Sequence, residues 1–467
     1  MVYDAGDAEG ADADAGERKG RRFEARPAPP RLDYYLLAEE ILTRLPPRFA
    51  AACAVGALRG ILTDLGYWRH RNRRLPRPRA ACLLVGAGAG AGEGGRLLHE
   101  FHFHHADAAV SAEPAAVVRV SGGPPSSPQA AYRLAGACNG LVLLAAPWSR
   151  RRRLTGVLFN PASGEEETVA VNLLGDGGGG GANRFWRFCA LGYAPSSKAY
   201  KALACASAGD GHGELLAVPF AGAAAAQRPR TVALIHSESY VNPTSLTSDD
   251  GGEVYILAGP SETALLIWDV AGESASVTAP IPIPPTARPV SVLMELWGRP
   301  CVALRHGCQS MATSLWVLSP EHRWERRCRF AVPASHAGPR LCLHGAWDCG
   351  GGRLFGLFRD GRRFTADIGG AAGGAGAHRR VRVSPRQPEE EEARTSMAEL
   401  QKGTFCWGYT PTLVRLASVF GDGEGGGAGG LMRHYPSGGE RRRHGRKSRR
   451  CLEALVEMMT QRPPEHG

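Results

Sequence analysis

Short apolar runs and alternating apolar and polar positions dominate the chain from about residue 79 to residue 420. Runs of this length, each bounded by turn residues, are typical of β-strands. The clearest are 141–144, 156–159, 254–257, 265–270, 292–297, 301–304, 314–318, 354–358 and 362–368. About 340 residues of such strands exceed one β-sandwich but fit six to eight blades of about 40 to 50 residues. We therefore predict a mainly-β domain over residues 80–420, an irregular six- to eight-bladed β-propeller.

The sequence CLLVGAGAGAGEGG (82–95) has the form of a strand that runs into a glycine-rich phosphate loop. A phosphate loop should be followed by a helix, whose first N–H groups face the anion. Here residues 96–105 alternate instead, with Leu97, Phe101 and Phe103 on one face and Glu100, His102 and His104 on the other. Alternation predicts a strand. We interpret the segment as a long-looped β-hairpin rather than a nucleotide site.

Residues 31–75 have a different period. Apolar side chains recur at helical spacing at Leu36, Leu37, Ile41, Leu42 and Leu45, after Asp33 as a candidate N-cap and before the stop at Pro46-Pro47. A second helical pattern follows, over residues 49–65. About 40 residues are too few for a large independent core. We expect this small helical unit to dock on another surface.

The two ends of the chain lack these patterns. Residues 1–30 are rich in charge, alanine and glycine, which predicts disorder. Residues 421–467 combine a glycine run, a basic cluster and a short apolar stretch at 451–459, which predicts a flexible tail with a short helix. The cluster is a candidate nuclear-localisation or polyanion patch, with a solvated tail as the alternative. Its basic residues are Arg441, Arg442, Arg443, Arg446, Lys447, Arg449 and Arg450.

Composition bears on where in the cell the protein is expected. The chain has 467 residues and a formal net charge of +11, spread mostly as dispersed arginines, so we expect nucleic acid to be an unlikely partner. It has no apolar run long enough to span a membrane and no signal-peptide core near its first residue. Its 12 cysteines form no CxxC pair, which favours reduced, buried thiols and a nuclear or cytoplasmic location.

Candidate chemistry is sparse. Glu100, His102 and His104 share one face of a predicted strand and could ligate a metal, but the sequence shows no third, distant ligand, so we favour a solvent-facing strand. The sequence has no GxSxG, HExxH or CxxC constellation. We expect no cofactor, no metal and no catalytic activity.

Four motifs in order carry a resemblance. They are LLAEEILTRLPP (36–47), ACNGLVL (137–143), LFNPASG (158–164) and LGYAPSSKAYK (191–201). A leucine-rich helix ending in RLPP before a long β domain resembles the plant F-box proteins with a kelch-like, F-box-associated domain. GYTPTLV (408–414) looks like the closing strand of that domain. Asn139-Gly140 and Asn160-Pro161 are also turn residues in their own right.

The resemblance implies a function. Such a chain would be the substrate-recognition subunit of a Skp–cullin–F-box ubiquitin ligase, in which Leu36, Leu37, Ile41, Leu42, Leu45 and Pro46 bind a Skp-like adaptor and, through it, cullin. The β domain would bind an unknown target protein, with tryptophans as candidate anchors; the sequence does not show which of them belong to the core. The candidates are Trp148, Trp186, Trp297, Trp316 and Trp324.

The second predicted helix departs from the family. Gly56 and Leu58 stand where cysteine and tryptophan are usual, so the F-box is degenerate. Glycine within a helix costs about 1 kcal/mol relative to alanine. The alternative function is therefore an adaptor-independent scaffold that binds polyanions through the basic tail at 441–450.

Overall fold

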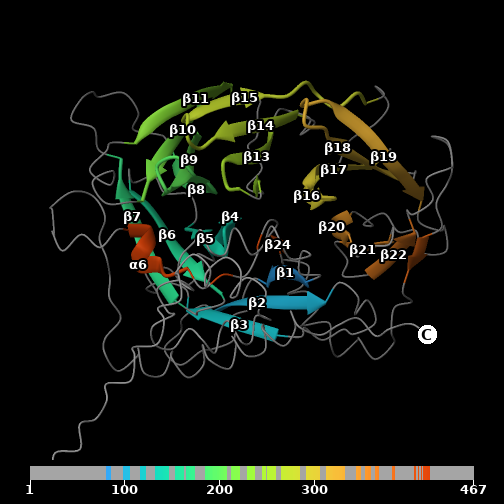
Figure 1. The fold of residues 1–467 in the computed structure, drawn as a ribbon, viewed down its shortest axis with the longest axis horizontal. Coiled ribbons are helices and arrows are strands. Elements are labelled where there is room, and N and C mark those ends of the chain that lie inside the picture. The colour runs from blue at the N-terminus through green and yellow to red at the C-terminus, as the bar shows by residue number, and fades with distance from the viewer. Residues whose placement is uncertain are drawn as a thin grey trace, which may run out of the picture.

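The computed structural model describes the strands between residues 80 and 405 and most of their tight turns, together with Tyr409, Thr412 and residues 414–420. Within these residues there are six four-stranded antiparallel sheets, arranged in a ring (Figure 1). Each sheet is a blade of a β-propeller, and each uses strands that are consecutive in sequence except the first. The prediction of a β-propeller is confirmed, with six blades in the described part.

Blade 1 joins the two ends of the domain, because its order is β24-β1-β2-β3. Its bounds are β24 Thr404–Phe405, β1 Ala80–Val85, β2 Leu98–His105 and β3 Ala116–Ser121. β1 pairs antiparallel with β2, which confirms the predicted hairpin on either side of the glycine-rich loop. β24 pairs with the other edge of β1, so a late strand closes the ring.

The other five blades each begin at one edge strand and proceed strand by strand to the other edge. Blade 2 consists of β4 Arg133–Cys138, β5 Leu141–Ala145, β6 Arg153–Asn160 and β7 Glu165–Asn172. Blade 3 consists of β8 Phe185–Ala194, β9 Ala199–Ser207, β10 His212–Pro219 and β11 Arg230–His236. Blade 4 consists of β12 Ser245–Thr247, β13 Glu253–Ala258, β14 Ala264–Asp269 and β15 Ser274–Val277.

The ring is completed by two blades on the right of Figure 1. Blade 5 consists of β16 Ser291–Leu296, β17 Arg299–Arg305, β18 Ala312–Leu318 and β19 Trp324–Ala331. Blade 6 consists of β20 Leu343–Asp348, β21 Arg353–Phe358, β22 Arg363–Asp367 and β23 Val381–Val383. A short helix, α6 Leu416–Phe420, follows the closing strand.

The core lies between blades. One cluster of buried side chains joins blades 2 and 3, a second joins blades 3 and 4, and a third joins blades 4, 5 and 6. A strand inside the ring is covered on both faces, which is why β5 has the sequence LVLLA with every residue buried. Trp268 is likewise fully buried, in the cluster between blades 3 and 4.

The sequence misplaced the closing strand. β24 lies upstream of the predicted segment 408–414, in which Tyr409, Thr412 and Val414 belong to no strand. Thr412 and Val414 bind blade 2 instead. Two other predicted strands, 265–270 and 292–297, end one residue early, because Val270 and Trp297 belong to turns. The helical unit at 31–75, residues 1–30 and the tail at 421–467 lie outside the described residues.

Candidate interaction surface

Tight turns gather on one face of the propeller. Neighbouring strands of a blade are antiparallel, so the connection between its first and second strands and the connection between its third and fourth strands lie at the same edge. Every described residue with positive φ lies in such a connection, and we call this side the turn face. These residues are Asn139, Gly140, Lys198, Gly251, Glu273, Trp297, Gly298 and His322. Such turns fix the backbone tightly and present side chains on a rigid scaffold.

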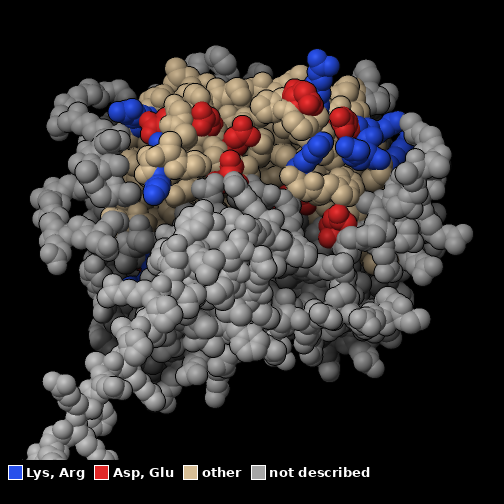
Figure 2. Space-filling model, in the orientation of Figure 1, with Lys and Arg blue, Asp and Glu red and all other residues tan. Residues whose placement is uncertain are grey.

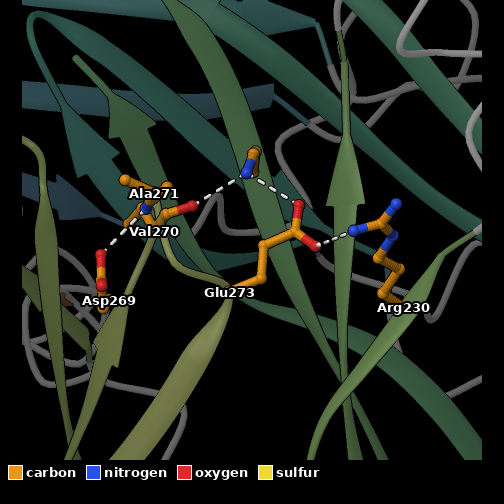
Figure 3. Close-up of polar contacts among 6 residues, drawn as sticks. Arg230, Asp269, Val270, Ala271 and Glu273 are labelled. Atoms are coloured by element: carbon orange, nitrogen blue, oxygen red, sulfur yellow. Dashed lines mark hydrogen bonds and ion pairs between the residues drawn. The ribbon is translucent and has the colours of Figure 1, made fainter. Parts of the chain in front are cut away.

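An ion pair locks blade 3 to blade 4 on this face (Figure 3). The Lys201 ammonium on β9 donates to the Glu273 carboxylate at 2.7 Å and to the Val270 carbonyl oxygen at 2.9 Å. Glu273 and Val270 belong to the turn between β14 and β15. Arg230, at the start of β11, lies 3.7 Å from the other Glu273 oxygen. Because Lys201 and Glu273 are largely buried, loss of either partner leaves a desolvated charge.

The conformation of that turn is set by its own residues. The Asp269 carboxylate accepts a hydrogen bond from the Ala271 N–H at 3.0 Å, which closes the turn. Glu273 then takes a φ of 51°, which aims its carboxylate at Lys201. The lock therefore depends on the turn geometry as well as on charge.

The β8–β9 hairpin completes the blade 3 side. Tyr193 and Tyr200 pair edge-to-face with ring centroids 4.9 Å apart, and the Tyr193 N–H donates to the Gly251 carbonyl oxygen of blade 4 at 2.9 Å. A side chain at Gly192 would collide with Val270. The LGYAPSSKAYK motif is thus an inter-blade joint, and its turn, residues 195–198, is exposed.

The C-terminal segment lies against blade 2 on the same face. The Asn160 side-chain amide donates to the carbonyl oxygens of Thr412, at 3.1 Å, and Val414, at 2.8 Å. The Thr412 hydroxyl donates to the Asn139 carbonyl oxygen at 3.0 Å, and the Leu416 N–H donates to Glu165 at 2.9 Å. We call Thr412 and residues 414–420 the latch.

The end of the latch is apolar. Leu416, Val419 and Phe420 join the buried cluster between blades 2 and 3. There the Phe420 ring lies 6.1 Å from the Phe220 ring, centroid to centroid. Burial of this helix face adds to the hydrogen bonds of Asn160 in holding the segment that follows the closing strand.

Blade 5 presents an aromatic and basic patch. Trp297 and Gly298, with φ values of 54° and 72°, form a two-residue turn between β16 and β17. Both values suit a type I′ turn, which favours asparagine at its first position. Such a backbone conformation costs a bulky residue roughly 1–3 kcal/mol. The Trp297 side chain is nevertheless 37% exposed.

Two arginines lie at the same edge of the blade as this turn. Arg299 follows it directly, and Arg323 lies in the adjoining β18–β19 turn, at the same edge of the blade. The pKa of the Glu321 carboxyl in that turn is lowered, first by the Ser319 hydroxyl and a backbone N–H and further by Arg299 and Arg323. Both guanidinium groups therefore favour the charged form of the same carboxyl group, that of Glu321.

The basic character continues along the outer strand β19. Arg326, Arg327 and Arg329 are exposed, and Figure 2 shows Lys and Arg side chains gathered over this strand. Arg327 pairs with Glu325 at 3.2 Å, both half exposed, so the pair contributes little to stability. Charged side chains also prevent an edge strand from pairing with other chains.

Several buried groups have shifted pKa values, among them Cys189 and Tyr255. The Cys189 thiol, 0% exposed, has its pKa raised by its hydrogen bond with Cys205 and by burial. Burial, and then the adjacent Glu253 carboxylate, raise the pKa of the Tyr255 phenol. Both groups are neutral at physiological pH. Among the described residues, no three His, Cys, Asp or Glu side chains are grouped to hold a metal ion.

The structure describes only some of the residues that the sequence singled out. The adaptor-binding residues Leu36–Pro46, the basic cluster 441–450 and Trp148 lie outside the described residues. The alternating segment with Glu100, His102 and His104 is strand β2, as predicted. Of the candidate tryptophans, Trp186 is buried, Trp316 and Trp324 are half-buried and Trp297 is exposed. The sequence missed Glu273, Arg299 and Arg323, because no local pattern shows which turns meet across blades.

Among known proteins, no family model and no curated protein matches the chain. Among solved structures, the Pseudomonas aeruginosa periplasmic gluconolactonase PpgL superposes with a TM-score of 0.38 at 16% identity, over 66% of this chain and 83% of that one. The Myceliophteria thermophila Cps50 (Swd1) β-propeller domain gives a TM-score of 0.33 at 10% identity, over 67% and 89%. A putative Bacteroides uniformis 6-phosphogluconolactonase gives 0.32 at 11%, over 66% and 100%. These scores carry no functional argument.

In the described part of the chain, no helix is long and apolar enough to cross a membrane.

Proposed function

We propose that this protein is the non-catalytic substrate-recognition subunit of a Skp–cullin–F-box ubiquitin ligase. The observation that carries the proposal is the rigid turn face, where exposed turns are fixed by positive φ and by hydrogen bonds between blades. A surface of preorganised turns loses little conformational entropy when it binds another protein. Such a surface suits recognition of a folded or extended target.

The leucine-rich segment supplies the second half of the proposal. Leu36, Leu37, Ile41, Leu42, Leu45 and Pro46 would present an apolar helix face to the Skp-like adaptor. The adaptor links the chain to cullin, and ubiquitin transfer is carried out by the partner subunits. The role of this chain is to hold a target in place, in the nucleus or cytoplasm.

A second candidate function follows from the departures at Gly56 and Leu58. If these residues abolish adaptor binding, the propeller acts as an adaptor-independent interaction scaffold. The basic tail at 441–450 would then bind polyanions, and its affinity would fall steeply with salt.

The test is a binding measurement between the full-length chain and purified Skp-like adaptor. The Leu37→Asp, Ile41→Asp double variant should bind at least about 100-fold more weakly, because each aspartate removes about 1.5 kcal/mol or more of apolar burial. Leu234→Asp is the matched control, because Leu234 is 78% exposed on β11 and should leave adaptor affinity unchanged.

Two outcomes would favour the second candidate. One is a wild-type chain that does not bind the adaptor; the other is a double variant that binds as tightly as the wild type.

A further inference from the structure

We propose that the turn-face patch of blade 5, centred on Trp297 with Arg299 and Arg323, binds an acidic peptide segment of the target. The inference rests on the proposed role of the propeller as the target-binding part and names the chemistry of that target. Trp297 would contact an apolar residue of the segment, and the two guanidinium groups would bind its carboxylates.

The first argument is the conformation of Trp297. Blade 2 has the same two-residue turn in the same place, Asn139-Gly140, with φ values of 49° and 80°. Asparagine at that position fits the turn. Blade 5 instead places a large aromatic residue at φ 54° and leaves it partly exposed. An apolar residue that has an unfavourable backbone conformation and is also exposed to solvent is typical of a functional position.

The second argument is composition. Tryptophan and arginine are the residues that most often dominate binding energy at protein interfaces. Here they lie at one edge of one blade, on turns held by hydrogen bonds. The Ser319 carbonyl oxygen accepts from the His322 N–H at 3.0 Å, and the Ser319 N–H donates to the Arg323 carbonyl oxygen at 2.8 Å. Arg323 therefore projects from a fixed backbone.

The third argument is charge complementarity. The Ser319 hydroxyl and a backbone N–H do most to lower the pKa of the chain's own Glu321 carboxyl, and Arg299 and Arg323 add smaller contributions in the same direction. Arg326 and Arg329 extend the positive charge outward along β19. An acidic segment that starts at Trp297 and runs outward would meet these arginines in turn.

The choice of a peptide over nucleic acid follows from the acidic residues within the patch. Glu321 and Glu325 are exposed among the arginines. A dense polyanion would place phosphates against both carboxylates, whereas a peptide can place neutral residues there. The patch is also limited to one blade, which is shorter than most phosphate tracks.

The experiment is a fluorescence-anisotropy titration of the full-length chain, without adaptor. The probe is a fluorescein-labelled glutamate-rich peptide with one central phenylalanine. Its counterpart has lysine in place of every glutamate, and a labelled oligothymidylate tests nucleic acid. We expect the glutamate peptide alone to bind, more weakly as salt rises.

The key variant is Trp297→Asn, which copies the blade 2 turn. We expect at least about 10-fold weaker peptide binding, with a melting temperature no lower than that of the wild type. Arg299→Ala and Arg323→Ala should each weaken binding severalfold. Arg133→Ala, an exposed arginine at the far end of β4 from the turn face, is the matched control and should have no effect.

Three outcomes would overturn the proposal. They are absence of peptide binding by the wild type, unchanged binding by a folded Trp297→Asn variant, and oligothymidylate binding that is lost in Arg299→Ala and Arg323→Ala. Because the adaptor is absent from this titration, failure here is distinct from failure of adaptor docking.

Discussion

Single charged and polar side chains join neighbouring blades at the turn face. Lys201 and Glu273 do so between blades 3 and 4, and Asn160 does so between blade 2 and the latch. Lys201 binds both Glu273 and the Val270 carbonyl oxygen, and Asn160 binds the carbonyl oxygens of both Thr412 and Val414. Lys201 and Asn160 were recognised in the sequence as parts of turn motifs. Their partners could not be predicted, because Glu273 and Val414 lie far away in the sequence.

The inter-blade ion pair gives a first prediction. Glu273→Ala should lower the free energy of unfolding by about 3 kcal/mol, because the buried Lys201 ammonium keeps the Val270 carbonyl oxygen but loses its counter-ion. Urea denaturation measures the change. Glu325→Ala is the matched control: it removes the exposed pair with Arg327 and should change stability by less than about 1 kcal/mol. Equal effects of the two substitutions would contradict the account.

The Tyr255 phenol gives a pH dependence. Its pKa is raised above the ordinary 10.0 by burial and by Glu253, so the folded chain holds this proton more tightly than the unfolded chain does. The resulting stabilisation is complete below about pH 10 and is lost as pH rises above it. Urea denaturation of the wild type should therefore show a steeper loss of stability as pH rises above about 10 than that of Tyr255→Phe. Parallel curves would mean that Tyr255 does not titrate differently in the two states.

Strands were predicted well at the scale of elements, and the segments that join or follow them were not. Apolar runs such as Leu141–Ala145 identify buried strands because a blade is covered on both faces. The closing strand was misplaced because β24 has two residues, too few for any periodicity. Thr412 and Val414 of the GYTPTLV motif instead belong to the latch, which depends on Asn139 in the β4–β5 turn and on Asn160 at the end of β6. Helix α6 was also missed, because it has only five residues and is stabilised by tertiary packing rather than by its own sequence pattern.

The latch gives a prediction at this scale. Asn160→Ala removes the donor for the carbonyl oxygens of Thr412 and Val414, so stability should fall by about 1–3 kcal/mol and α6 should exchange its amide hydrogens faster. Hydrogen exchange read by mass spectrometry measures this peptide directly. Thr231→Ala is the control, because it removes an exposed hydrogen bond to Glu214 on blade 3. Unchanged exchange in α6 would show that its apolar face suffices to hold it.

The whole molecule combines a β-propeller with segments that lie outside the described residues. The fold class could be predicted because regular strand spacing over this length has few solutions. The candidate site could not be predicted, because it consists of turns between different pairs of strands, which meet at one edge of a blade only in the folded chain. Trp297 illustrates this: the sequence placed it at the end of a strand, whereas the structure places it in a strained, exposed turn beside Arg323.

The central claim is that one chain binds an adaptor and a target at separate surfaces. Sedimentation velocity of the full-length chain with Skp-like adaptor and the labelled glutamate-rich peptide tests it most directly. The account predicts one species that contains all three, from which Trp297→Asn removes only the peptide and Leu37→Asp, Ile41→Asp removes only the adaptor. Competition between the adaptor and the peptide, or loss of both partners in either variant, would contradict the account.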